Sequence, residues 1–81
     1  MPKLKVLSGE DVIKIFKKFG FEISGQKGSH IKLVRLLKNN VKEPITIPNH
    51  KEIDRGTLKA IIRQASKYIS EEDLKNHFYS E

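Results

Sequence analysis

The spacing of apolar residues predicts a helix close to the N-terminus, over residues 8–19. Apolar side chains recur three and four residues apart with lysines between them, which is the period of one face of an α-helix. These apolar positions are Val12, Ile13, Phe16 and Phe19. Ser8 and Asp11 stand in the order of a capping box, and Gly20 is a residue type that often ends a helix. The pattern therefore predicts an amphipathic helix that buries one face.

From residue 21 the apolar period shortens to two, which predicts β-strands. A first strand leads into a tight turn at Lys27-Gly28, and a returning strand follows over residues 29–37. A polar connection over residues 38–43 precedes a third strand that ends at Pro48. The apolar positions of the alternation are Phe21, Ile23, Ile31, Leu33, Ile45 and Ile47. We therefore expect a three-stranded antiparallel sheet with one apolar face.

Two further helices are predicted after the third strand. Asp54 suits the N-cap of the first, and Ser70 with three acidic residues after it suits the start of the second. The apolar positions are Leu58, Ile61, Ile62 and Ala65 in the first helix and Leu74 and Phe78 in the second. The order helix, three strands, helix and short helix predicts one α+β domain over residues 1–81. The helices cover one face of the sheet in this arrangement and leave the other face open.

Polar side chains are expected on the open face of the sheet, as is common in antiparallel sheets. They are Glu22, Ser24, Gln26, His30, Lys32 and Thr46. A second basic feature follows in the helix after Asp54, where four cations recur every four residues and form a stripe. They are Arg55, Lys59, Arg63 and Lys67. The stripe favours contacts with phosphates, and a solvated helix face is the alternative.

The charge balance favours a polyanionic partner. Sixteen Lys and Arg against ten Asp and Glu give a net charge of +6, and such a field attracts nucleic acid. The alternative is solubility alone, since a net charge of about 2 to 8 is ordinary for a small domain. The aromatic residues add little, because the phenylalanines stand mostly at core spacing.

Several classes of protein are excluded or disfavoured. The absence of cysteine rules out disulfides and thiolate zinc sites, and the three histidines lie too far apart in sequence to suggest a metal site. We expect neither metal nor cofactor. The apolar runs are far shorter than the roughly 18 residues that span a bilayer, and the N-terminus lacks the pattern of a signal peptide. We therefore expect a cytoplasmic protein with no membrane contact.

The stretch Lys27-Gly28-Ser29-His30 offers chemistry at the mouth of the hairpin. Histidine takes and gives protons near neutrality, and RNA carries its own nucleophile, the 2′-hydroxyl. The stretch therefore suggests a domain that cleaves or binds nucleic acid, and if the substrate is RNA, cleavage needs only a base, a cation near the phosphate and a proton for the leaving oxygen. We assign His30 as the candidate catalytic residue, with Lys27 or Lys32 as the cation and His50 as an auxiliary proton donor. The alternatives are an indifferent surface histidine at 30 and a backbone-bonded loop histidine at 50.

These residues also resemble a known family. The chain is similar to the HicA toxins, small messenger-RNA interferases of toxin-antitoxin pairs, along nearly its whole length. The matching motifs are Ser8-Gly9-Glu10-Asp11-Val12, Phe19-Gly20-Phe21, Lys27-Gly28-Ser29-His30, Ile45-Thr46-Ile47-Pro48-Asn49-His50 and Gly56-Thr57-Leu58-Lys59-Ala60-Ile61. The resemblance implies an α-β-β-β-α fold like the double-stranded-RNA-binding domain, with a short extra C-terminal helix. It also implies endoribonuclease activity on messenger RNA, catalysis by His30 and neutralisation by a HicB-type antitoxin.

The residues expected to contact RNA lie in the hairpin and on the basic helix. They are Lys27, Gly28, Ser29, Lys32, Arg55, Lys59 and Arg63. Two other functions fit the same surface. One is a double-stranded-RNA-binding module without catalysis, in which loss of the His30 side chain would change affinity little. The other is a protein-interaction domain whose open sheet face and edge strand receive an acidic partner.

Overall fold

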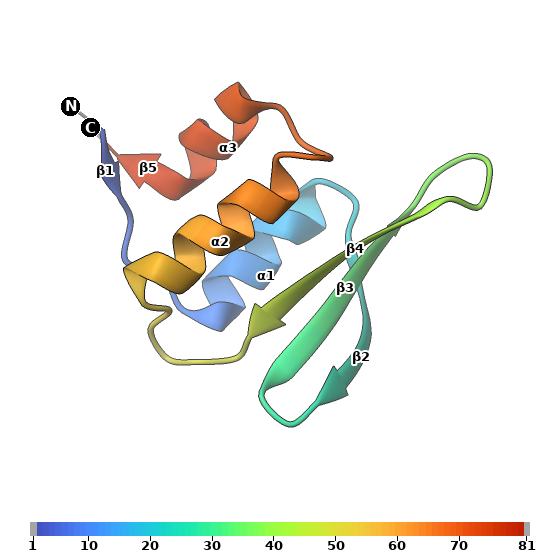
Figure 1. Cartoon of the computed structure of the whole chain (residues 1–81), viewed down its shortest axis with the longest axis horizontal. Helices are drawn as coiled ribbons and strands as arrows, with labels where there is room; N and C mark the ends of the chain where they lie inside the picture. The colour runs from blue at the N-terminus through green and yellow to red at the C-terminus, as the bar shows by residue number, and fades with distance from the viewer. Residues whose placement is uncertain (1, 81) are drawn as a thin grey trace.

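The computed structural model describes residues 2–80 and confirms the predicted α+β fold (Figure 1). Its elements are β1 (Lys3–Leu4), α1 (Gly9–Lys18), β2 (Glu22–Lys27), β3 (His30–Leu36), β4 (Lys42–Pro48), α2 (Arg55–Ala65), α3 (Glu71–Phe78) and β5 (Tyr79–Ser80). The order α1-β2-β3-β4-α2 is that of a double-stranded-RNA-binding domain, and α3 is the predicted extra helix. The short antiparallel pair of β1 and β5 was not predicted. Among residues 2–80, no helix is long and apolar enough to span a membrane.

The helices begin where their local signals predicted. Ser8 and Asp11 form a capping box at α1, each side chain bonding the other residue's main-chain N–H at 3.0 Å. Asp54 and Ser70 cap α2 and α3. The bonds from Ser8 lower the pKa of Asp11 below its ordinary value. The end of α2 differs from the prediction, because the helix stops at Ala65 and leaves Lys67 outside it.

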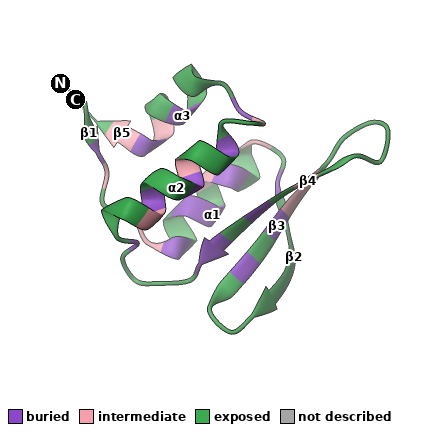
Figure 2. Cartoon of the chain, viewed as in Figure 1, coloured by how far each residue is buried: buried purple, intermediate pink, exposed green. Residues whose placement is uncertain are grey.

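The core lies between the helices and one face of β3 and β4, and Figure 2 shows buried positions on all of these elements. Both α1 and α2 pack against β4. Ile31 and Leu33 of β3 and Ile45 and Ile47 of β4 are buried, as the alternation predicted. The helices, β1 and the loops on both sides of α2 supply most of the remaining core: Leu4, Val12, Ile13, Phe16, Ile53, Leu58, Ile61, Ala65, Ile69, Leu74 and Phe78.

The strand β2 departs from the predicted burial. All six of its residues are exposed, including Ile23 at 51%, whereas Phe21 just before it is fully buried. Ile23 pairs with the buried Leu33 and so lies on the predicted face of the sheet, but the expectation that it is buried there with Phe21 was wrong. The sheet order is β2-β3-β4 and the helices pack on β4, so β2 is an edge strand beyond their cover.

An irregularity in β2 also changes the predicted pairing of two residues assigned to the open face. The pairing with β3 shifts between Ile23 and Gly25, which leaves Ser24 without a regular partner. Beyond the shift Gln26 pairs with Ile31, and directly paired residues lie on the same face of a sheet. In the register Gln26 is thus aligned with Ile31 and not with His30 and Lys32, which corrects the predicted set.

The β2–β3 turn consists of Gly28 and Ser29, one residue later than predicted, with Lys27 and His30 paired across its base. Gly28 has a φ of +59°, which a glycine adopts without strain. At the other end of β3, the strand β4 begins at Lys42, inside the segment predicted as a polar connection.

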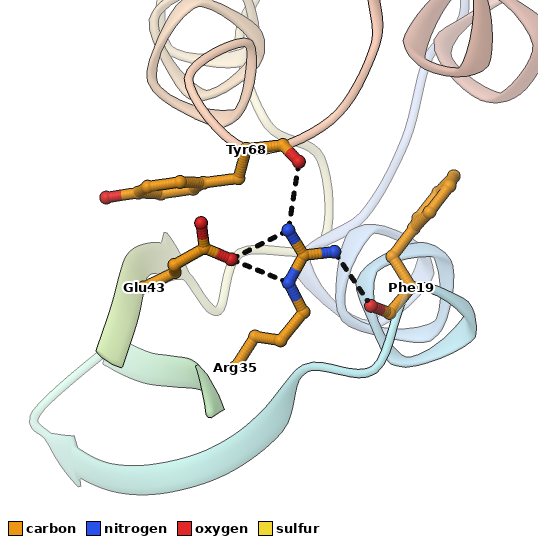
Figure 3. A network of polar contacts seen from close by, with 4 residues as sticks. All are labelled: Phe19, Arg35, Glu43 and Tyr68. Carbon is orange, nitrogen blue, oxygen red and sulfur yellow. Dashed lines mark hydrogen bonds and ion pairs between the residues drawn. The ribbon is translucent and has the colours of Figure 1, made fainter. Parts of the chain in front are cut away.

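A polar cluster around Arg35 ties the second half of the sheet to the helices (Figure 3). The Arg35 guanidinium bonds the Glu43 carboxylate at 2.7 Å, the Phe19 carbonyl at 3.2 Å and the Tyr68 carbonyl at 2.9 Å. It also lies 5.0 Å from the centre of the Phe21 ring. The Phe19 carbonyl lies at the C-terminal end of α1, and the Tyr68 carbonyl lies in the turn after α2. Carbonyls at the C-terminal end of a helix have no hydrogen-bond partner within the helix. The Arg35 cluster therefore joins three separate segments.

Candidate functional site

His30 is the first residue of β3 and lies on the open face of the sheet. It pairs with Lys27 of β2 on one side and with Pro48 of β4 on the other. The next row on the same face holds Lys32 and Thr46, which are paired with each other. All of these except Pro48 are exposed. The sheet register therefore places His30 beside two lysines, of which the alternation of β3 predicted Lys32.

Two shallow hollows border His30 and Thr46. The first, which we name the cationic hollow, has a volume of about 300 Å³. It is lined by Ser24, Gly25, Gln26, Lys27, His30, Lys32 and Thr46. The second, which we name the β4–α2 groove, has a volume of about 340 Å³. It is lined by His30, Thr46, Pro48, His50, Thr57, Ala60, Ile61 and Gln64. His30 therefore stands between a positively charged depression and one without lysine or arginine.

His50 lies in the loop between β4 and α2, and it lines the β4–α2 groove together with His30. The loop is held by main-chain hydrogen bonds at both sides of this residue. The His50 carbonyl accepts a bond from the Gly9 N–H at 2.8 Å, and the Asn49 N–H donates to the Ser29 carbonyl at 2.6 Å. The second bond links the loop directly to the hairpin turn before His30. The structure thus brings together two histidines that are distant in sequence.

Gly9 is a positioning residue that the sequence did not reveal as such. A Cβ added at this position would lie 2.5 Å from the Pro48 carbonyl oxygen and 2.9 Å from the Asn49 Cα. The first turn of α1 is therefore pressed against the backbone that leads to His50, and only glycine fits there without movement. Its position just after the capping serine suggested only the start of a helix.

The start of α2 is fixed beside the groove by Asp54. Its carboxylate accepts bonds from the Thr57 N–H at 3.0 Å and from the Thr57 hydroxyl at 2.7 Å. These two bonds lower the pKa of Asp54 below its ordinary value. Because the hydroxyl proton points to Asp54, the Thr57 oxygen offers only lone pairs to the groove.

The predicted basic stripe of α2 is not part of this site. Arg55, Lys59 and Arg63 are exposed and share one side of the helix, since they are spaced four residues apart. The groove is lined from a different side of α2, by the set Thr57, Ala60 and Gln64. Arg63 instead lines a hollow between α2 and α3. The role of these three cations in RNA binding stays a prediction.

The turn residues Gly28 and Ser29 line neither hollow, although they lie next to both. The Gly28 carbonyl accepts a bond from the Gln26 side-chain amide at 2.9 Å, and the Ser29 carbonyl accepts the Asn49 bond described above. These two carbonyls therefore stabilise the hairpin turn and its contact with the β4–α2 loop. Within residues 2–80, no three His, Cys, Asp or Glu side chains gather as ligands for a metal ion.

Comparison with known protein families identifies the chain. Residues 9–66 match the sequence model of a family described as the HicA toxin of bacterial toxin-antitoxin systems. The matched segment runs from the start of α1 to the end of α2 and includes His30, His50 and both hollows. A comparison with curated proteins gives no match, and a comparison with solved structures gives none either. Because the match covers well over half of its residues, the chain belongs to the HicA toxin family of bacterial toxin-antitoxin systems.

Proposed function

We propose that this toxin is an endoribonuclease that cleaves messenger RNA in the cytoplasm, with His30 and His50 transferring the protons. The observation that carries the proposal is the presence of both histidines on one groove. His30 also borders the cationic hollow, so a phosphodiester bound at Lys27 and Lys32 lies against an imidazole. Two imidazoles and two cations around one phosphate are a sufficient set for RNA cleavage.

The reaction uses the nucleophile that RNA itself carries. His30 takes the proton of a 2′-hydroxyl, the 2′-oxygen bonds to phosphorus, and the bond between phosphorus and the 5′-oxygen breaks. His50 gives its proton to the departing 5′-oxygen. The products are a 2′,3′-cyclic phosphate and a 5′-hydroxyl, and the two histidines have exchanged protonation states. No step in this sequence uses a metal ion.

Charge stabilisation is assigned to the lysines of the sheet. Negative charge grows on the phosphoryl oxygens in the transition state, and Lys27 and Lys32 line the hollow beside His30 where these oxygens lie. Gly28 and Ser29 line neither hollow, and we assign them an RNA contact only through their place in the turn next to Lys27 and His30. The exposed cations Arg55, Lys59 and Arg63 add to the positive field that draws RNA to the surface.

The partner implied by the family is an antitoxin, and we propose one of the HicB type. An acidic antitoxin laid over the open sheet face would cover His30 and complement the net charge of +6. Addition of the antitoxin is then expected to stop cleavage in proportion to complex formation, and high salt is expected to weaken the complex.

The roles of the two histidines are separated by changing the leaving group. An RNA whose 5′-bridging oxygen at the cleaved bond is replaced by sulfur loses a thiolate, which departs without a proton. We expect His50→Ala to cleave normal RNA slowly and to regain most of the rate on this substrate, whereas His30→Ala stays slow on both. A 2′-deoxy nucleotide at the cleaved bond should abolish cleavage by the natural chain, and EDTA should not.

Three results would contradict the proposal. Cleavage at a 2′-deoxy position would show that the 2′-hydroxyl is not the nucleophile. Equal rates for the natural chain and a folded His30→Ala variant would remove the histidine from the reaction. Binding of RNA without any cleavage, unchanged in His30→Ala, would favour a non-catalytic RNA-binding module.

A further inference from the structure

The β4–α2 groove has a chemical character that proton transfer does not explain. Apart from the two histidines, its lining holds no ionisable side chain. Pro48 and Ile61, both buried, form an apolar base, and α2 contributes Thr57, Ala60 and Gln64. A surface that binds only phosphates needs cations, as the cationic hollow has. The groove therefore suits an uncharged, partly apolar group of the substrate.

The polar groups on the α2 side can read the edge of such a group. None of the side-chain hydrogen bonds among residues 2–80 involves Gln64, so its amide has a free donor and a free acceptor. The Thr57 hydroxyl donates its proton to the Asp54 carboxylate, with 2.7 Å between the two oxygens, so toward the groove it can only accept a hydrogen bond. A carboxamide pairs with a nucleobase edge through two hydrogen bonds at once.

We infer that the β4–α2 groove binds one unpaired nucleobase next to the cleaved phosphate, and that Gln64 selects this base. The inference rests on the proposed ribonuclease function. The ribose-phosphate chain then crosses the ridge formed by His30 and Thr46, with its phosphate over the cationic hollow and the neighbouring base in the groove. A volume of about 340 Å³ lies at the small end of ligand sites, which run from about 300 to 1,000 Å³, and fits one base rather than a stack.

The arrangement also requires the base to be unstacked. Proteins read RNA sequence on single strands, where a base turns out of its stack and pairs along its free edge. Ala60 decides whether the groove is open, because its side chain is the smallest on this side of α2 and lies between Thr57 and Gln64 in the helix. A large side chain at Ala60 would fill the groove and leave the sheet face unchanged.

The test measures base preference in an RNA pool with random nucleotides around the cleaved bond, using the full chain. Sequencing of the new 5′-hydroxyl ends is expected to show a preference of about 5- to 150-fold at one position for the natural chain. Gln64→Ala and Ala60→Phe should reduce this preference to about twofold or less. Ala60→Ser, which keeps the groove open, is the matched control and should retain it. Both positions, 60 and 64, are exposed, and circular dichroism checks that each of the three variants is folded.

The outcomes separate this inference from the proposed function. Cleavage with a preference that Gln64→Ala and Ala60→Phe leave unchanged would overturn the groove assignment and keep the ribonuclease. If the natural chain cleaves no RNA, the proposed function fails, and fluorescence anisotropy with four single-stranded RNAs of one base each tests the groove directly. A difference in affinity that disappears in Gln64→Ala supports base binding in the groove, and equal affinities overturn it.

Discussion

The strand β3 carries a polar side chain near each end, and the surroundings of the two differ. Arg35 bonds one carboxylate and two carbonyls, and its side chain is only 21% exposed. His30 is exposed and makes no side-chain hydrogen bond to another residue in the described part of the chain. A group whose partners are all inside the protein stabilises the fold, whereas a group without partners is available to a substrate. We therefore expect that removal of the His30 side chain lowers activity and that removal of the Arg35 side chain lowers stability.

Removal of the imidazole should affect activity alone, and by the largest factor. His30→Ala is expected to lower RNA cleavage by about 10²- to 10⁴-fold, the usual contribution of a general acid or base. Its melting temperature should stay within a degree or two, because no internal contact is lost. Cleavage of a defined RNA and thermal unfolding are measured on the same preparation. A large fall in melting temperature would show that His30 also has a structural role and would weaken the comparison.

Removal of the guanidinium should affect stability instead. Arg35→Ala leaves the Glu43 carboxylate and two carbonyls without partners, and we expect a loss of about 2–3 kcal/mol of unfolding free energy. Urea unfolding measures it, with Lys42→Ala as the control, since Lys42 is exposed and next to Glu43. The replacement of both partners, Arg35→Met with Glu43→Met, should recover part of the loss. An unchanged urea midpoint in Arg35→Ala would show that the network contributes nothing.

The same contrast explains what the sequence could predict. The starts of the helices depend on residues three apart, such as Ser8 with Asp11, so local pattern sufficed. The Arg35 cluster joins residues up to 33 positions apart in sequence, and its role depends on how the segments meet. The exposure of Ile23 depends likewise on which strand the helices cover.

The candidate site divides in a similar way. Alternation along β3 correctly placed His30 and Lys32 on one face, since only neighbouring residues decide it. The role of His50 as a second proton donor beside His30 was proposed from chemistry. The two residues come close only because the loop folds back onto the hairpin turn. The groove wall at Thr57, Ala60 and Gln64 gave no signal, because neutral residues on a helix surface are ordinary.

Gly9 connects the two kinds of region, because it is a packing residue that positions the loop of the site. Gly9→Ala is expected to lower the unfolding free energy by about 1–2 kcal/mol. The new methyl group overlaps the Pro48 carbonyl oxygen, and the cost of this overlap exceeds the gain from the higher helix propensity of alanine. Cleavage should fall as well, because the backbone at His50 must shift. Urea unfolding and cleavage rates measure both effects.

Gly56→Ala is the matched control for this substitution. Gly56 lies in the first turn of α2, and a Cβ there would meet only the Asp54 carboxylate at 3.4 Å. We expect unchanged or slightly higher stability and normal cleavage. If both variants behave alike, steric contact at Gly9 does not control the loop.

The smallest expected effect concerns the acid limit of the fold at Asp54. The bonds from Thr57 hold the pKa of Asp54 below 3.8, its ordinary value, so the folded chain keeps this carboxylate ionised at lower pH than the unfolded chain does. The contribution of the group to stability is therefore complete above about pH 4 and is lost as the pH falls through the lowered pKa. Asp54→Asn keeps a capping oxygen but cannot ionise, so its melting temperature should approach that of the natural chain as the pH falls from 5 to about 2. Because Asp54 lies at the surface, salt should reduce the difference at pH 5. A constant difference across this range would show that the cap acts through geometry alone, and that charge at the start of α2 plays no part in holding Thr57 beside the groove.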